Sequence, residues 1–171
     1  SMTSQANRSY FIDSVRYWAG DDTSIVVDND RTNDKEYDNE QMAIDDIEEE
    51  LDLDVPLILY HPENFEFRSY NVNVESGYAL MEYYYGQEIV TLYINDYSNE
   101  RKSGAYILDG KEIATVKMKN DNINITIKKI RDKNDKKESY AAYWEKDSVF
   151  YQISGKMQRN EFMNLVKNIK F

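Results

Sequence analysis

The chain has 171 residues, no cysteine and a formal net charge of −11. This length allows one domain with its own hydrophobic core, and the lack of cysteine excludes disulfides and thiolate metal sites. The acidic balance argues against a nucleic-acid partner, because phosphates are bound by clusters of Lys and Arg. No apolar run approaches the roughly 18 residues of a bilayer-spanning helix, so we expect any membrane anchor to lie outside this sequence.

The first 54 residues are predicted to form an N-terminal region that packs on, or is linked to, a main domain at 55–171. Near the start, one helical stripe holds four apolar residues, namely Phe11, Val15, Trp18 and Ala19. Gly20 stands where this amphipathic helix would end. Residues 23–27 contain Thr, Ile and two Val, which indicates a short strand.

Acidic residues dominate the remainder of this region, since residues 21–54 hold fifteen Asp or Glu and two basic residues. Residues 28–40 contain almost no apolar side chain and predict a loop. The next segment, 41–51, brings Ile44 and its apolar neighbours to one side of a short acidic helix. The whole stretch 28–54 is interpreted as a solvated acidic segment.

A calcium-binding loop is the alternative for the acidic residues of 28–40. Asp28, Asp30 and other oxygen-bearing residues alternate there as calcium ligands do. However, Asn33 stands where such a loop requires Gly, and Asn39 stands where it requires a bidentate Glu. The sequence therefore predicts no metal site.

From residue 55 onward, apolar residues recur with the period of two that is typical of strands. The phase of this pattern changes between Phe67 and Tyr70, so we expect a β-bulge near Ser69. Further strands are predicted at 78–86, 88–96, 104–110, 112–119 and 122–129, and a hairpin at 140–154 that turns at 145–148. Six or seven antiparallel strands are expected to form a curved sheet.

The C-terminal segment is predicted to be a helix. Phe162, Leu165, Val166 and Ile169 occupy positions i, i+3, i+4 and i+7, which form one apolar stripe. Helices at both ends of a run of strands indicate an α+β domain, with one face of the sheet covered by the helices.

Residue patterns for catalysis are weak in this sequence. His61 is the only histidine, so a catalytic triad or a histidine-rich metal site would depend on it alone. The tripeptide Ser154-Gly155-Lys156 lacks the earlier Gly and the following Ser or Thr of a phosphate-binding loop. We predict no catalytic residue and no cofactor, and hence a protein that is not an enzyme.

Fifteen tyrosines form the most unusual feature of the composition. In Tyr83-Tyr84-Tyr85, consecutive rings on a strand must alternate faces, so at least one ring points away from the core. These three residues are the candidate ligand contacts. The alternative is that tyrosine suits half-buried strand positions and only packs there.

Two motifs resemble a known family of bacterial domains of unknown function. The first, VPLILYHPENF, contains Pro62 and Phe65, and the second, WEKDSVFYQISG, contains Trp144, Tyr151 and Gly155. The likeness covers about Leu53–Phe171, and these five residues are its fold signature. Trp144 and Tyr151 are expected to pair across the hairpin, and Gly155 to release the chain from the sheet.

Members of that family lie at the C-terminal, extracytoplasmic end of membrane-anchored proteins similar to anti-sigma factors in Gram-positive bacteria. The resemblance thus implies a sensory or interaction module with a protein or small-molecule partner, attached to the membrane only through a segment outside this sequence. The alternative is a domain that binds a lipid, glycan or peptide and resembles lipoprotein-carrier folds.

Overall fold

The computed structural model describes residues 36–96, 110–130 and 136–171. The predicted helix before Gly20, the predicted strand at 23–27 and most of the predicted strand at 104–110 lie outside these residues. The described elements are, in chain order, α2 (Glu36–Leu51), β1 (Leu57–Ile58), β2 (Phe65–Asn73), β3 (Tyr78–Tyr85), β4 (Glu88–Asp96), β5 (Gly110–Lys117), β6 (Asn124–Ile130), β7 (Ser139–Lys146), β8 (Val149–Lys156), α3 (Arg159–Lys167) and β9 (Ile169–Lys170).

The strands form one seven-stranded antiparallel sheet in the order β2-β3-β4-β8-β7-β6-β5. The short strands β1 and β9 pair with each other in a separate ribbon. Because α2 precedes the strands and α3 follows the last strand of the sheet, the predicted α+β class is confirmed. The expected bulge is also present, as a register shift between Phe67 and Ser69.

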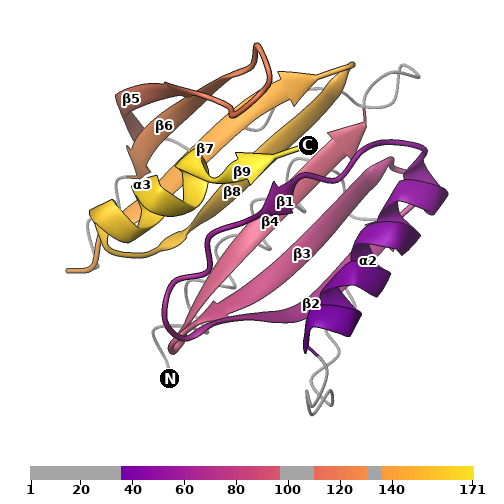
Figure 1. The fold of residues 1–171 in the computed structure, drawn as a ribbon, viewed down its shortest axis with the longest axis horizontal. Coiled ribbons are helices and arrows are strands. Elements are labelled where there is room, and N and C mark those ends of the chain that lie inside the picture. The colour runs from indigo at the N-terminus through magenta and orange to yellow at the C-terminus, as the bar shows by residue number, and fades with distance from the viewer. Residues whose placement is uncertain (1–35, 97–109, 131–135) are drawn as a thin grey trace.

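One face of the sheet carries the hydrophobic core. Figure 1 shows α2, the β1–β9 ribbon and α3 lying across this face. Ile47 of α2 and Phe162 of α3 are completely buried there, and alternate residues of the central strands, such as Leu92 and Ile153, face them. The period-two pattern of the strands therefore supplies one side of the core, and the helical stripes supply the other.

The hairpin of β7 and β8 has the predicted form. Trp144 and Tyr151 are directly opposite, and their rings stack with centroids 5.6 Å apart. Asp147 and Ser148 make the turn, and both have positive φ. Asn64, another residue with positive φ, lies in the turn between Pro62 and Phe65, which is closed by a hydrogen bond from the Phe65 N–H to the Pro62 carbonyl.

Three local predictions require correction. The α2 helix begins at Glu36, inside the predicted loop, and its Glu40 accepts a hydrogen bond from the buried Tyr83 hydroxyl at 2.8 Å. The first turns of α2 are therefore held to the sheet by a polar contact, which a search for apolar periodicity does not detect. At the other end α3 stops at Lys167, and Ile169 is buried through pairing of β9 with β1.

The third correction concerns the role of Gly155, which lies one residue before the end of β8, next to the predicted exit from the sheet. It is still paired with Val90 of β4, so it does not itself release the chain. A Cβ at this position would lie 2.9 Å from the Ile89 carbonyl oxygen and 2.9 Å from Cγ2 of Val90. Glycine is required here because β4 and β8 approach closely, which is a packing requirement.

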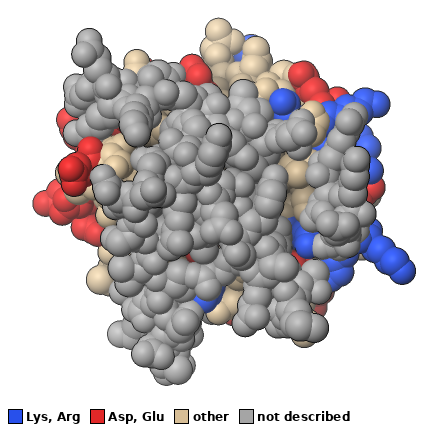
Figure 2. Space-filling model, turned by 180° about the vertical axis from the view of Figure 1, so that it is seen from behind, with Lys and Arg blue, Asp and Glu red and all other residues tan. Residues whose placement is uncertain are grey.

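Charge is separated along the molecule. Residues 36–54 hold ten Asp or Glu and no basic residue, whereas 110–130 hold five Lys and two acidic residues. In Figure 2, a group of acidic side chains lies at the left edge, and most basic side chains lie at the right, where some acidic side chains also occur. The side chains on the second face of the sheet include a buried ion pair of Arg68 with Glu82.

Candidate functional site

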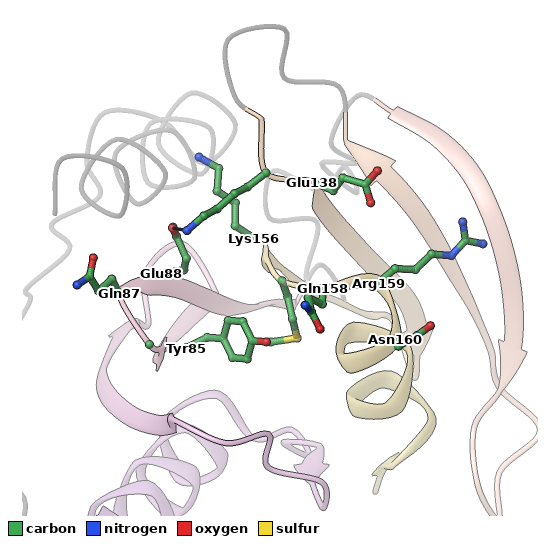
Figure 3. A pocket seen from close by; sticks show the side chains of 11 residues that line it. Tyr85, Gln87, Glu88, Glu138, Lys156, Gln158, Arg159 and Asn160 are labelled. Carbon is green, nitrogen blue, oxygen red and sulfur yellow. Dashed lines mark hydrogen bonds and ion pairs between the residues drawn. The ribbon is translucent and has the colours of Figure 1, made fainter.

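A cavity of about 810 Å³ lies at one end of the sheet, where four segments meet. Its walls come from the β3–β4 turn, the start of β7, the end of β8 and the start of α3 (Figure 3). The lining residues are Tyr85, Gly86, Gln87, Glu88, Lys137, Glu138, Lys156, Met157, Gln158, Arg159 and Asn160. A cavity of this size is in the range of small-molecule sites.

Sheet pairing brings these segments together. Gly86 turns the chain between β3 and β4 with φ of 58°, and its N–H donates to the Asn64 carbonyl at 2.9 Å. In the sheet, β8 lies between β4 and β7, and Gly155 pairs with Val90 on one side and Tyr140 on the other. The close approach at Gly155 thus sets the position of Lys156 relative to Glu88.

Glu88 is the most deeply buried acidic residue of the lining, with 5% of its surface exposed. Its Oε1 accepts a hydrogen bond from Lys137 Nζ at 3.0 Å. Its Oε2 is also buried, and within the described residues it receives no hydrogen bond. A buried carboxylate oxygen without a donor is costly, so this atom is a natural place for a ligand donor.

The opposite wall is the first turn of α3. Gln158 is the N-cap residue, and its side chain makes no capping hydrogen bond. The first N–H groups of a helix lack partners inside the helix and carry partial positive charge. Because Gln158, Arg159 and Asn160 all line the cavity, this wall favours groups that accept hydrogen bonds.

Tyr85 supplies an aromatic ring, which extends from the turn toward the start of α3 (Figure 3). Burial raises the pKa of its hydroxyl, and the nearby Glu161 carboxylate and Tyr60 raise it further. The phenol therefore remains neutral at physiological pH and can donate a hydrogen bond.

The three predicted contact tyrosines do not form one surface. Tyr83 is buried in the core, where its ring stacks on Phe65 with centroids 4.8 Å apart. Tyr84 is 38% exposed, and its hydroxyl accepts a hydrogen bond from Arg68 Nε at 2.8 Å. Only Tyr85 lines the cavity. Sequence reasoning missed Glu88, Lys137 and Gln158, because nothing in their own neighbourhoods indicates that they meet.

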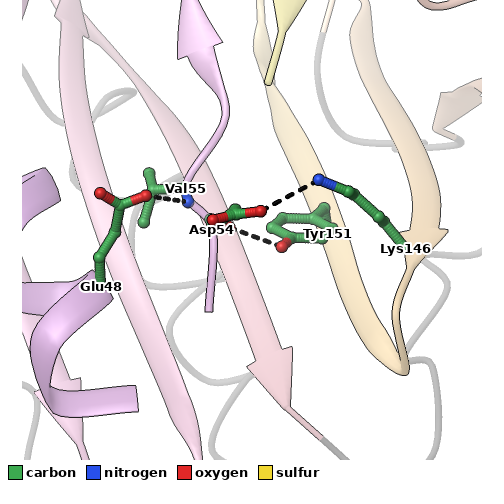
Figure 4. Close-up of polar contacts among 5 residues, drawn as sticks. All are labelled: Glu48, Asp54, Val55, Lys146 and Tyr151. Carbon is green, nitrogen blue, oxygen red and sulfur yellow. Dashed lines mark hydrogen bonds and ion pairs between the residues drawn. The ribbon is translucent and has the colours of Figure 1, made fainter. Parts of the chain in front are cut away.

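A second polar cluster joins α2 to the hairpin. Tyr151 donates a hydrogen bond to the Asp54 carbonyl at 2.6 Å, and Lys146 pairs with the Asp54 carboxylate at 3.1 Å (Figure 4). Glu48 accepts a hydrogen bond from the Val55 N–H at 3.0 Å. Burial, followed by the charge of Asp54, raises the pKa of Tyr151. These contacts fix the chain between α2 and β1, so the signature residue Tyr151 has a structural role.

The described residues contain neither a metal-binding cluster nor a membrane-spanning helix. Within 36–96, 110–130 and 136–171, no group of three or more His, Asp or Glu residues is placed to hold a metal ion. No helix of these segments is long and apolar enough to cross a membrane. His61 is exposed, and its Nε2 lies 3.0 Å from the Ile58 carbonyl oxygen.

The family model described as "Domain of unknown function (DUF4367)" matches residues 55–169. The chain belongs to this family. No curated protein and no solved structure matches the chain. Every lining residue of the cavity lies inside the matched DUF4367 segment, whereas α2 precedes it.

Proposed function

We propose that the chain is a non-enzymatic sensory module that binds its ligand in the cavity between the β3–β4 turn and α3. In this proposal it is carried outside the cytoplasm by a membrane-anchored protein similar to an anti-sigma factor, in a Gram-positive bacterium. This context rests on the resemblance carried by the motifs around Pro62 and Trp144.

The cavity is the observation that carries the proposal. Its walls belong to four segments, and α3 contacts the sheet mainly through β7. A ligand that touches both Glu88 and the start of α3 would favour one position of the helix relative to the sheet. A ligand that binds more tightly to one position of α3 shifts the population of the domain toward that position, and a sensor can use this shift as a signal.

Binding of a lipid between the sheet and the helices is the second candidate. A cavity of about 600 Å³ between α2 and the β1–β9 ribbon favours it, since Ile44, Leu57 and Phe171 line its walls. Charged side chains including Glu48 and Asp121 line the same cavity. Because a lipid chain gains little from charged walls, we prefer the first candidate.

The location is tested with the full-length native protein fused at its C-terminus to alkaline phosphatase, which is active only outside the cytoplasm. We expect the phosphatase fusion to be active. A matched fusion to a fluorescent protein that folds only in the cytoplasm should show no fluorescence. An inactive phosphatase together with a fluorescent partner fusion would place the domain inside the cell and overturn the proposed location.

A further inference from the structure

We propose that the cavity at α3 selects a peptide-like ligand with a free ammonium group, and that Glu88 is the residue that recognises this group. The inference rests on the proposed sensory function and names the ligand class of the same site. Three features of the cavity carry it. Within the described residues, the Glu88 carboxylate has one oxygen without a donor, the first N–H groups of α3 have no side-chain cap, and Tyr85 and Met157 provide apolar surface between them.

The carboxylate of Glu88 has a donor on one oxygen and, within the described residues, none on the other. Lys137 occupies Oε1, while Oε2 receives no hydrogen bond in the described part of the chain. Oε2 is buried in the chain without ligand, so binding requires the carboxylate to rotate about its last torsion, which is broad in Glu side chains. An ammonium group would supply charge-assisted hydrogen bonds to this oxygen.

An anionic ligand is disfavoured at the same wall. Lys137 contacts only Oε1, so a phosphate or carboxylate placed against Oε2 would lie next to a buried carboxylate oxygen that has no donor among the described residues and would be repelled by it. A neutral sugar hydroxyl would make only an uncharged donor contact, which is weaker than that of an ammonium group. Of these three groups, an ammonium group is therefore the one that Glu88 should bind most strongly.

The α3 wall determines which groups the other end of the ligand should carry. Carbonyl or carboxylate oxygens placed there would accept hydrogen bonds from the uncapped helix start and from the amide of Gln158. Tyr85 and the buried Met157 provide apolar surface for the body of the ligand. An ammonium group at one end, oxygen acceptors at the other and an apolar side chain between them describe a short peptide with a free N-terminus.

The test compares the tripeptide Leu-Ala-Ala with its N-acetylated form, which differs in the loss of the ammonium group. Both are titrated to millimolar concentration into the 15N-labelled chain and followed by NMR. We expect the free tripeptide to shift backbone amides at 85–88 and 156–160, and acetylation to weaken binding about tenfold. Glu88→Gln is expected to bind both forms with the same low affinity, whereas the control Glu66→Gln, at an exposed position on β2, should behave as the parent.

Equal affinity of the parent chain for the two forms would overturn the inference, whatever the variants do. If neither tripeptide shifts the cavity amides but small molecules extracted from a bacterial envelope do, the ligand class is wrong and the sensory function stands. If none of these probes shifts the cavity amides, both the ligand class and the proposed function are wrong.

Discussion

Trp144 is a signature residue that stabilises the fold by packing in the core. Its ring is 2% exposed, stacks on Tyr151 and belongs to the core under the two helices. The indole N–H is buried without an acceptor in the described residues, so the side chain contributes through packing. A residue in this position is expected to affect stability far more than binding.

We therefore predict that Trp144→Ala lowers the free energy of unfolding by about 3–5 kcal/mol, because it opens a large cavity in the core. Urea denaturation followed by circular dichroism measures this change. Trp144→Phe is the matched control and should lose less, since it keeps a ring and gives up no hydrogen bond. An alanine variant as stable as the parent would show that the ring is not part of the core.

Tyr140 links stability to alkaline pH. Burial and the hydrogen bond to Glu138 raise its pKa from 10.0 to about 12. The folded state therefore holds the proton more tightly than the unfolded chain does. This contribution to stability is fully present below pH 10.0 and is lost as the pH rises through about 12.

The parent chain should thus lose stability between pH 10.0 and about 12, and Tyr140→Phe should lose less over the same interval. The pKa values of the buried Tyr83 and Tyr93 are raised as well, so the variant reduces the loss without abolishing it. Denaturation midpoints across this pH range provide the measurement. Parallel pH profiles for parent and variant would contradict the assigned role of Tyr140.

At the scale of elements, α2 is part of the same core as the family-matched sheet. Ala43 and Ile47 are completely buried, and Tyr70 of β2 donates a hydrogen bond to Asp46 at 2.9 Å. The helix thus lies before the matched segment in sequence but contacts β2 and β3 in space. Its acidic residues do not prevent this packing, because Asp45, Glu49 and Glu50 are exposed. The half-buried Glu40 and Asp46 accept hydrogen bonds from tyrosine hydroxyls of the sheet.

Ile47→Ala is predicted to lower the free energy of unfolding by about 2–5 kcal/mol. The control Met42→Ala lies on the same helix at a side chain that is 62% exposed, and should change stability by less than about 0.5 kcal/mol. Equal effects of the two substitutions in thermal or urea unfolding would mean that α2 does not pack on the sheet.

The sequence predicts elements well where local chemistry determines them. Alternating apolar residues predict β6, the phase change predicts the bulge before Ser69, and the spacing of Phe162 and Leu165 predicts α3. The prediction that Ile169 belongs to the helix is wrong, because this residue lies in β9. An apolar side chain is required for burial in a strand as much as in a helix. A pattern of burial alone does not distinguish the two.

At the scale of the whole molecule, the cavity could not be predicted. The β3–β4 turn is about fifty residues before the other walls in sequence, and it meets them because β8 inserts between β4 and β7. Strand order depends on pairings between distant segments, which the period of a single strand does not encode. The sequence thus identified Tyr85 as a candidate through its position in a run of tyrosines, and gave no sign of Glu88 or Gln158.

The proposed function depends on ligand binding in this cavity of the family-matched domain. Gln158→Trp tests it well, because the Gln158 side chain makes no capping bond that the substitution would remove, and the larger ring is expected to obstruct the cavity at the start of α3. Thr115→Trp, at an exposed position on the edge strand β5, is the matched control.

Hydrogen exchange is measured for parent and variants with and without small molecules extracted from a bacterial envelope. We expect the added molecules to slow exchange at 85–88 and 156–160 in the parent and in Thr115→Trp, and to change nothing in Gln158→Trp. Protection that appears elsewhere in the chain, or that persists in Gln158→Trp, would contradict the proposed function.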